Sequence, residues 1–112
     1  MNVTQATGSV IVAPTVLARL VHLAVTEVPG VARMGTAPAA SVLNATIHDG
    51  IVVKISGDQA AADCYVIAGP DTNLLELGVT VQATVAAVIQ QLVGMGVREV
   101  NVYIQDVEVH RG

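Results

Sequence analysis

The sequence predicts a two-layer α+β domain in which two helices cover one face of a mostly antiparallel sheet. Two segments, at 14–28 and 74–93, repeat apolar residues at helical spacing. β-Rich runs lie around them, and the Asp49-Gly50 pair divides one of these runs in the manner of a hairpin. We expect the element order β-α-β-β-β-α-β in a single domain of residues 1–112, with residues 1–8 frayed.

The N-terminal part is expected to hold a strand and a helix. Residues 8–12, Gly-Ser-Val-Ile-Val, form a short strand-like run. Pro14 suits the first turn of a helix, where its missing N–H costs nothing, and Pro29-Gly30 ends that helix. One more short strand can follow at 31–34. The predicted core stripe of the helix is Val16, Leu17, Leu20, Val21, Ala24 and Val28, with Arg19, His22 and Thr26 on the other face.

The middle of the chain predicts strands. Runs at 42–48 and 51–56 flank Asp49-Gly50, and both positions of such a turn need a positive φ. Segment 57–63 is expected to be a loop, followed by a strand from Cys64 to Ala68. Residues expected to share a strand face are Leu43, Ala45 and Ile47 in the first run and Ile51, Val53 and Ile55 in the second.

The C-terminal part predicts a long helix and a last strand. Thr72 or Asn73 can cap the helix at about 74–93, and glycines at 94 and 96 end it. Its predicted core stripe is Leu74, Leu77, Val81, Val85, Val88 and Leu92. In the strand at 97–109, the alternation of Val100, Val102 and Ile104 changes parity at Val107 and Val109. That phase slip predicts a bulge, or an exit from the sheet, near Gln105-Asp106.

The second helix also carries an apolar stripe on another side. Glu76 is its single formal charge between residues 72 and 97. A helix that is apolar on two sides is usually covered on two sides, either by the first helix or by another subunit. The candidate interaction face consists of Leu75, Val79, Gln82, Ala86, Ile89 and Val93.

Composition excludes several classes of function. The net charge is −4, with five Lys and Arg and no Trp or Phe, which argues against nucleic acid and against direct docking on anionic lipid. Hydrophobic residues make up 53%, yet no uninterrupted apolar run reaches the roughly 18 residues of a spanning helix. The N-terminal residues lack the pattern of a secretory leader, and the single cysteine fits a reducing compartment. We therefore expect a cytoplasmic domain without direct membrane insertion.

Chemistry-bearing residues do not form a recognisable set. Cys64 has no neighbouring base in the sequence, and His22 is interpreted as a solvated surface residue. His48 and His110 lack metal-ligand spacing, and so do the loop carboxylates Asp58, Asp63 and Asp71. We expect no enzyme, no catalytic residue, no metal and no cofactor.

Two stretches resemble the alkaline shock protein 23 / general stress protein 24 family, and the resemblance spans nearly the whole chain. The N-terminal stretch, which resembles that family's short strand, helix and Glu-Val-x-Gly-Val turn, comprises Gly8-Ser9-Val10-Ile11-Val12, Val16, Leu20, Ala24 and Thr26-Glu27-Val28-Pro29-Gly30-Val31. The more specific C-terminal stretch comprises Val81-Gln82, Val85, Leu92-Val93-Gly94-Met95, Val97, Val100-Asn101-Val102 and Asp106-Val107.

The resemblance implies a non-catalytic bacterial protein of the cell-envelope stress response. Members of the family can self-assemble and can be held at the membrane by a separate integral-membrane anchor protein. We therefore expect a scaffold that forms homo-oligomers and is peripheral at the membrane through such a partner. The alternative hypothesis is a regulatory small-molecule-binding α+β module. A third hypothesis, an enzyme using Cys64 or His22, has no base–nucleophile spacing to support it.

Overall fold

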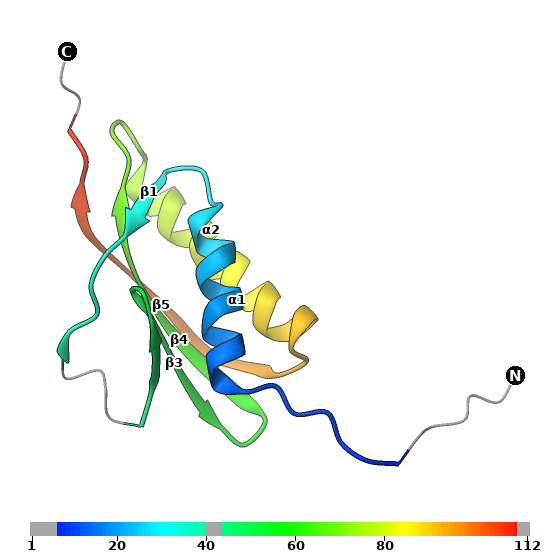
Figure 1. Ribbon diagram of the computed structural model, residues 1–112. Helices are drawn as coiled ribbons and strands as arrows, with labels where there is room; N and C mark the ends of the chain where they lie inside the picture. The colour runs from blue at the N-terminus through cyan, green and yellow to red at the C-terminus, as the bar shows by residue number, and fades with distance from the viewer. Residues whose placement is uncertain (1–6, 40–43, 110–112) are drawn as a thin grey trace, which may run out of the picture.

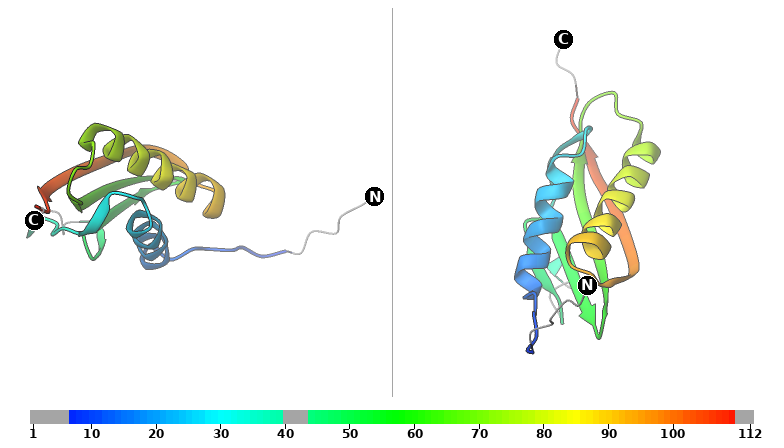
Figure 2. Two further views of the ribbon diagram at one scale, coloured as in Figure 1. Left: turned by 90° about the horizontal axis from the view of Figure 1, so that it is seen from above. Right: turned by 90° about the vertical axis from the view of Figure 1, so that its right-hand side faces the viewer.

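The computed structural model describes residues 7–39 and 44–109, and it confirms the predicted fold class. Two helices lie on one face of a five-stranded sheet (Figure 1; Figure 2). The elements, in chain order, are α1 (Pro14–Thr26), β1 (Val31–Met34), β2 (Thr46–His48), β3 (Ile51–Ser56), β4 (Gln59–Ala68), α2 (Leu74–Ala87), the π-helical turn η2 (Val88–Leu92) and β5 (Gly96–Val107). Of residues 1–8, which are expected to be frayed, residues 1–6 lie outside the described residues.

Strand β4 is the centre of the sheet. Along one edge it pairs in parallel with β5, from Gln59 to Ala68. Its other edge is shared, because β3 pairs antiparallel with its first part and β1 with its last part, while β2 pairs with β3. A parallel pair needs a crossover connection, and α2 supplies it between β4 and β5. The sheet is therefore mostly antiparallel, as predicted, with one parallel pair.

The junction where β3 gives way to β1 depends on Gly50. The Tyr65 N–H of β4 donates to the Gly50 carbonyl oxygen at 2.9 Å, and the Tyr65 carbonyl oxygen accepts from the Gly35 N–H at 2.8 Å. Gly50 has φ 79°, and a Cβ there would lie 2.8 Å from the Gly35 oxygen. The Asp49-Gly50 turn therefore closes the predicted hairpin and also admits a second strand beside it.

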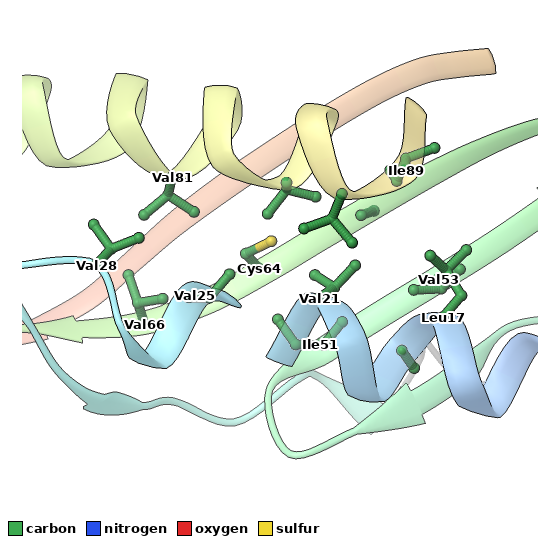
Figure 3. Close-up of a cluster of buried hydrophobic side chains, with 14 of the residues drawn as sticks. Leu17, Val21, Val25, Val28, Ile51, Val53, Cys64, Val66, Val81 and Ile89 are labelled. Atoms are coloured by element: carbon green, nitrogen blue, oxygen red, sulfur yellow. The ribbon is translucent and has the colours of Figure 1, made fainter. Parts of the chain in front are cut away.

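The core lies between the helices and the sheet (Figure 3). Alternate residues of the strands point toward the helices, as the predicted faces of Ile51 and Val53 require. Small residues on β4, Ala60 and Ala62, are buried in the same layer. The largest fully buried side chains include Leu17, Val21 and Val25 of α1, Ile51 and Val53 of β3, and Val81, Val85 and Ile89 of α2–η2. Leu43, expected on the same face of the first run, lies outside the described residues.

One predicted strand does not form, and one predicted loop is mostly strand. Residues 8–12 form no strand, and Val10 and Ile11 are 95% and 85% exposed, because this run has no strand partner among the described residues. The predicted loop at 57–63 shrinks to a turn at Gly57-Asp58, and β4 begins at Gln59. The alanines that suggested a loop are strand residues because pairing with β3 and burial under the helices decide their conformation.

The predicted core stripes are right in the middle of each helix and wrong at the ends. In α1, Val16 is 46% exposed, and Ala18 and Val25 are buried in addition to the predicted residues. In the second helix, Leu74 and Leu92 are 42% and 68% exposed. Since η2 places an extra residue in the last turn, the side that faces the core passes from position 92 to position 93.

The predicted bulge in the last strand is confirmed. Val66 pairs with Ile104 and Ile67 with Asp106, which leaves Gln105 as the extra residue. Its side chain accepts from the Thr36 N–H at 2.8 Å and donates to the Thr36 carbonyl oxygen at 2.9 Å. The bulge thus connects β5 to the segment that follows β1, on the opposite side of β4.

Candidate interaction surface

The outward side of α2 is apolar, and no element of the described residues covers it. Asn73 caps the helix, its Oδ1 accepting from the Glu76 N–H at 3.0 Å. Leu75, in the first turn, is 79% exposed, and Val79, one turn further along, is 56% exposed. Helix α1 approaches α2 on another flank, where Ala24 and Glu27 share a hollow with residues 80 and 84. The interpretation that α1 covers the second stripe is therefore wrong for Leu75 and Val79.

The C-terminal part of the predicted interaction face lies inside the protein. Ile89 is fully buried, and Val93 packs against the core. The π-helical turn explains the placement of Val93, because it rotates the residues that follow toward the sheet. Gln82 is exposed and its Nε2 donates to the Val100 carbonyl oxygen of β5 at 3.2 Å, and Ala86 is half-buried. We call Leu75, Val79, Gln82 and Ala86 the α2 outer face.

Helix α2 and η2 together have an unusual amount of apolar surface. The segment Leu74–Leu92 has 19 residues with a mean hydropathy of 1.2, so length and composition alone would let it cross a membrane. The segment is not an uninterrupted apolar run, because Glu76, Gln82 and Gln90 lie within it. One side of the segment is committed to the core through Leu77, Val81 and Val85, yet only 28% of it is buried. Leu75 and Val79 are apolar residues of this segment that lie exposed and could meet a partner.

Strand β5 borders the α2 outer face. Its inner edge pairs with β4, and its outer edge pairs with no strand in residues 7–39 and 44–109. A second bulge lies near its start, where Ala60 pairs with Val97 and Ala61 with Glu99, leaving Arg98 as the extra residue. The hydrogen bond from Gln82 to Val100 makes this edge continuous with the helix surface.

Cys64 and His22 have clear structural surroundings. Burial, and secondarily the negative charge of Asp63, raise the pKa of the Cys64 thiol to about 12, so the thiol is protonated at neutral pH. The sequence suggested that His22 is a solvated surface side chain, and this interpretation is wrong. Its Nε2 lies 3.0 Å from Asp49 Oδ2, and its ring meets the His48 ring edge-on at 4.8 Å. These contacts arise because α1 packs on the β2–β3 hairpin, a tertiary contact that no local pattern shows.

The sheet face away from the helices carries an aromatic pair that the sequence analysis missed. Tyr65 and Tyr103 stack with their ring centres 4.7 Å apart. Asp63, which accepts from Asn101 Nδ2 at 2.9 Å, is the main cause of a raised pKa of Tyr103. The parallel register of β4 and β5 places these residues opposite one another, and parallel pairing across a helix crossover has no short-range signal.

The loop carboxylates and the surface hollows give little support for a metal site or a small-molecule site. Asp58 lies in the β3–β4 turn, Asp63 on β4 and Asp71 before α2 with φ 59°. Within the described ranges, no three His, Cys, Asp or Glu residues gather in a way that could hold a metal ion. Four surface hollows measure about 280–290 Å³ each. That is at the lower limit of about 300 Å³ for small-molecule sites.

Known proteins similar to this chain fall into two groups. Two solved structures of the MamM CTD, both zinc forms, are 18% and 19% identical, with TM-scores of 0.47 and 0.44. They cover 83% and 85% of this chain, and the matches cover 85% and 84% of those chains. Similarity at this level says nothing about function.

The second group consists of proteins that are similar in sequence. The Bacillus subtilis (strain 168) protein named "Uncharacterized protein YloU" is 35% identical over 60 residues, which are 54% of this chain and 50% of that protein. The match therefore spans about half the length of this relative. The family model for alkaline shock protein 23, described by a cell envelope-related function, matches residues 2–109. With nearly all of its residues matched, the chain belongs to the alkaline shock protein 23 family, as its sequence motifs indicate.

Proposed function

We propose that this protein is a non-catalytic scaffold at the cell envelope that associates with itself and binds a membrane-anchored partner. The observation that carries the proposal is the exposure of Leu75 and Val79, at 79% and 56%, on a helix with one formal charge between residues 72 and 97. Adjacent exposed apolar side chains on a regular element mark protein–protein contact sites. Membership of a family with a cell envelope-related function gives the place where such contacts would act.

The charge of the chain favours contact with a protein over contact with lipid headgroups. The net charge is −4, and residues 72–97 contain no Lys or Arg. A helix that binds an anionic membrane surface normally carries a basic polar face. The α2 outer face has none, so it suits an apolar protein surface, either on another copy or on a membrane-anchored protein.

The test replaces Val79 by Lys, with Leu23→Lys on α1 as the matched control. Leu23 is 57% exposed, close to the 56% of Val79, so both variants should keep the fold. Light scattering over a concentration series should give a mass well above 11.5 kDa for the unchanged protein and for the control, and a mass near 11.5 kDa for Val79→Lys. An oligomer that persists in a folded Val79→Lys variant would contradict the role of this face.

The same variants test the membrane partner in cells. We expect the unchanged protein and Leu23→Lys to sediment with the membrane fraction, and Val79→Lys to leave it. Ile89→Glu is unsuitable for this purpose, although Ile89 belongs to the stripe predicted from the sequence, because its side chain is fully buried. Equal distribution of all three proteins between fractions would count against the partner.

A further inference from the structure

Proteins normally protect an unpaired strand edge by shortening it, by bulges, or by Lys, Pro or inward charges. In β5 the bulges lie at the two ends, and between them the Gln82 side chain hydrogen-bonds to the Val100 carbonyl oxygen. Strand β5 has 12 residues, and the part between its two bulges, Glu99–Ile104, contains no Lys and no Pro. This six-residue stretch is regular, and its outer edge is unpaired in the described part of the chain. It can accept another strand.

Face alternation restricts how a second copy could pair there. If both helix layers lie on the same side of a continuous sheet, opposite residues must share a face. Val100, Val102 and Ile104 face the helices. An antiparallel pair centred on Val102 therefore places Val100 opposite Ile104 on the helix side, and Asn101 opposite Tyr103 on the other.

Charge distinguishes this register from its neighbour. Centred on Val102, the regular stretch of each copy ends at its two bulges. Arg98 is the extra residue of the first bulge and Asp106 follows the second, so Arg98 of one copy comes near Asp106 of the other at both ends of the regular stretch. Centred on Asn101, the pair would place Arg98 opposite Ile104 and leave it without an acidic partner. Opposite charges across paired strands stabilise a sheet, so the Val102 register is favoured.

The same symmetry brings the α2 outer faces together. Helix α2 runs in the opposite direction to β5 (Figure 1), and Gln82 contacts Val100. Two residues along a strand cover about 6.6 Å, the length of roughly four helix residues, so the position beside Val102 is near Gly78. A Cβ added at Gly78 would meet nothing within 4 Å in the chain alone. A glycine there lets two helices approach closely, with Leu75 near Gln82 of the second copy.

We infer that a second copy of this chain binds along the β5 edge, antiparallel and centred on Val102, so that one continuous sheet forms and Leu75 and Val79 become buried between two α2 helices. This inference rests on the proposed self-association and specifies its geometry. A single partner thereby covers both the α2 outer face and the outer edge of β5, which the Gln82–Val100 hydrogen bond joins.

The test is a charge exchange across the new strand pair. Arg98→Asp and Asp106→Arg each place like charges together, and we expect each to raise the dimer dissociation constant by about tenfold or more. The double variant restores opposite charges and should return the constant to within about threefold of the original. Gly78→Leu, at a site where an added Cβ meets nothing within 4 Å, should weaken the dimer without unfolding it.

Hydrogen–deuterium exchange gives an independent readout of the strand pair. Amides in residues 99–104 should exchange more slowly in the dimer than in the diluted monomer, since edge amides gain acceptors. Additive effects in the charge exchange, together with unchanged exchange at 99–104 in a protein that still dimerises, would overturn the inference and leave the proposed function standing. Slowing of these amides only on adding a different protein would also overturn it. A monomer at every concentration would defeat the inference and the proposed self-association together.

Discussion

Helices α1 and α2 pack on the same face of the sheet, but their outward sides differ. The outward side of α1 carries Arg19 and Thr26 beside the exposed Leu23. The outward side of α2 exposes Leu75 and Val79, and Glu76 is the one formal charge in the sequence between residues 72 and 97. Polar residues identify the solvent side of α1 in the sequence. In α2 both the side that packs on the core and the exposed side are apolar, so the sequence does not distinguish them.

The largest effect should separate the buried and exposed parts of the stripe predicted on the second helix. Ile89→Glu places a carboxylate where the side chain is fully buried, which should cost more than about 4 kcal/mol and unfold the protein. Leu75→Glu, at a site 79% exposed, should change stability by less than about 0.5 kcal/mol. Urea unfolding followed by circular dichroism measures both. Equal losses would mean that the two ends of the stripe do not differ.

A matched pair of leucines tests α1 in the same way. Leu17 is fully buried and Leu23 is 57% exposed. Leu17→Ala should lower the free energy of unfolding by about 2–5 kcal/mol, because it leaves a cavity under the helix. Leu23→Ala should lower it by less than about 1 kcal/mol. Thermal denaturation of both variants checks the difference, and a large loss from Leu23→Ala would show that its exposed surface is covered by something else.

The core between the helices should also respond to alkali. Burial raises the pKa of the Cys64 thiol in the folded chain to about 12, above the ordinary value of 9.0. The neutral thiol therefore contributes fully below about pH 9, and stability should fall by about 1.4 kcal/mol per pH unit as the pH rises toward the folded pKa. Cys64→Ala should have a shallower slope over pH 9–11 in a denaturant series. Identical slopes would mean that the buried thiol does not limit alkaline stability.

The helix N-termini offer a smaller contrast. The N-cap of α2, Asn73, accepts a hydrogen bond from the Glu76 N–H, whereas Ala13 before α1 makes no side-chain cap. Asn73→Ala should cost about 1 kcal/mol, and Ala13→Asn should gain a few tenths to about 1 kcal/mol. Calorimetric melting temperatures of the two variants should move in opposite directions. A shift in the same direction would argue against capping as the cause.

The smallest effect concerns the glycine in α2. Gly78→Ala fills open space and restricts the unfolded chain, so it should raise stability by about 0.5–1 kcal/mol in dilute solution. Chemical denaturation at low protein concentration measures this gain without a contribution from self-association. A loss in stability would mean that Gly78 serves the fold of the single chain.

Much of the fold could be predicted because its signals are local. The hairpin followed from Asp49-Gly50, the cap from Asn73, and the bulge at Gln105 from a change of parity. Local patterns could not show the extra residue of the π-helical turn, which exposes Leu92 and turns Val93 inward. They also could not show that the strand-like run at 8–12 finds no partner among the described residues.

That the second helix carries an interaction face stays a prediction, and the structure shows only which of its residues are exposed. Leu75 and Val79 stand out in the sequence because no charge lies near them except Glu76, and both are exposed. Ile89 was placed on the wrong side of the helix. The contribution of β5 could not be foreseen, because it depends on which strand takes the edge beside β4. That outcome is decided by a crossover connection of more than twenty residues rather than by the strand itself.

The parallel pairing of β4 with β5 also has a consequence for the order of folding. Strands β2, β3 and β4 follow one another through tight turns, so their contacts form with little loss of loop entropy. Strand β5 can join only after the chain between residues 69 and 95 has closed over the sheet. Until then β4 has an open edge and the apolar inner side of α2 is unburied. During synthesis, the interval before the last strand emerges is therefore the period in which this protein most needs a chaperone.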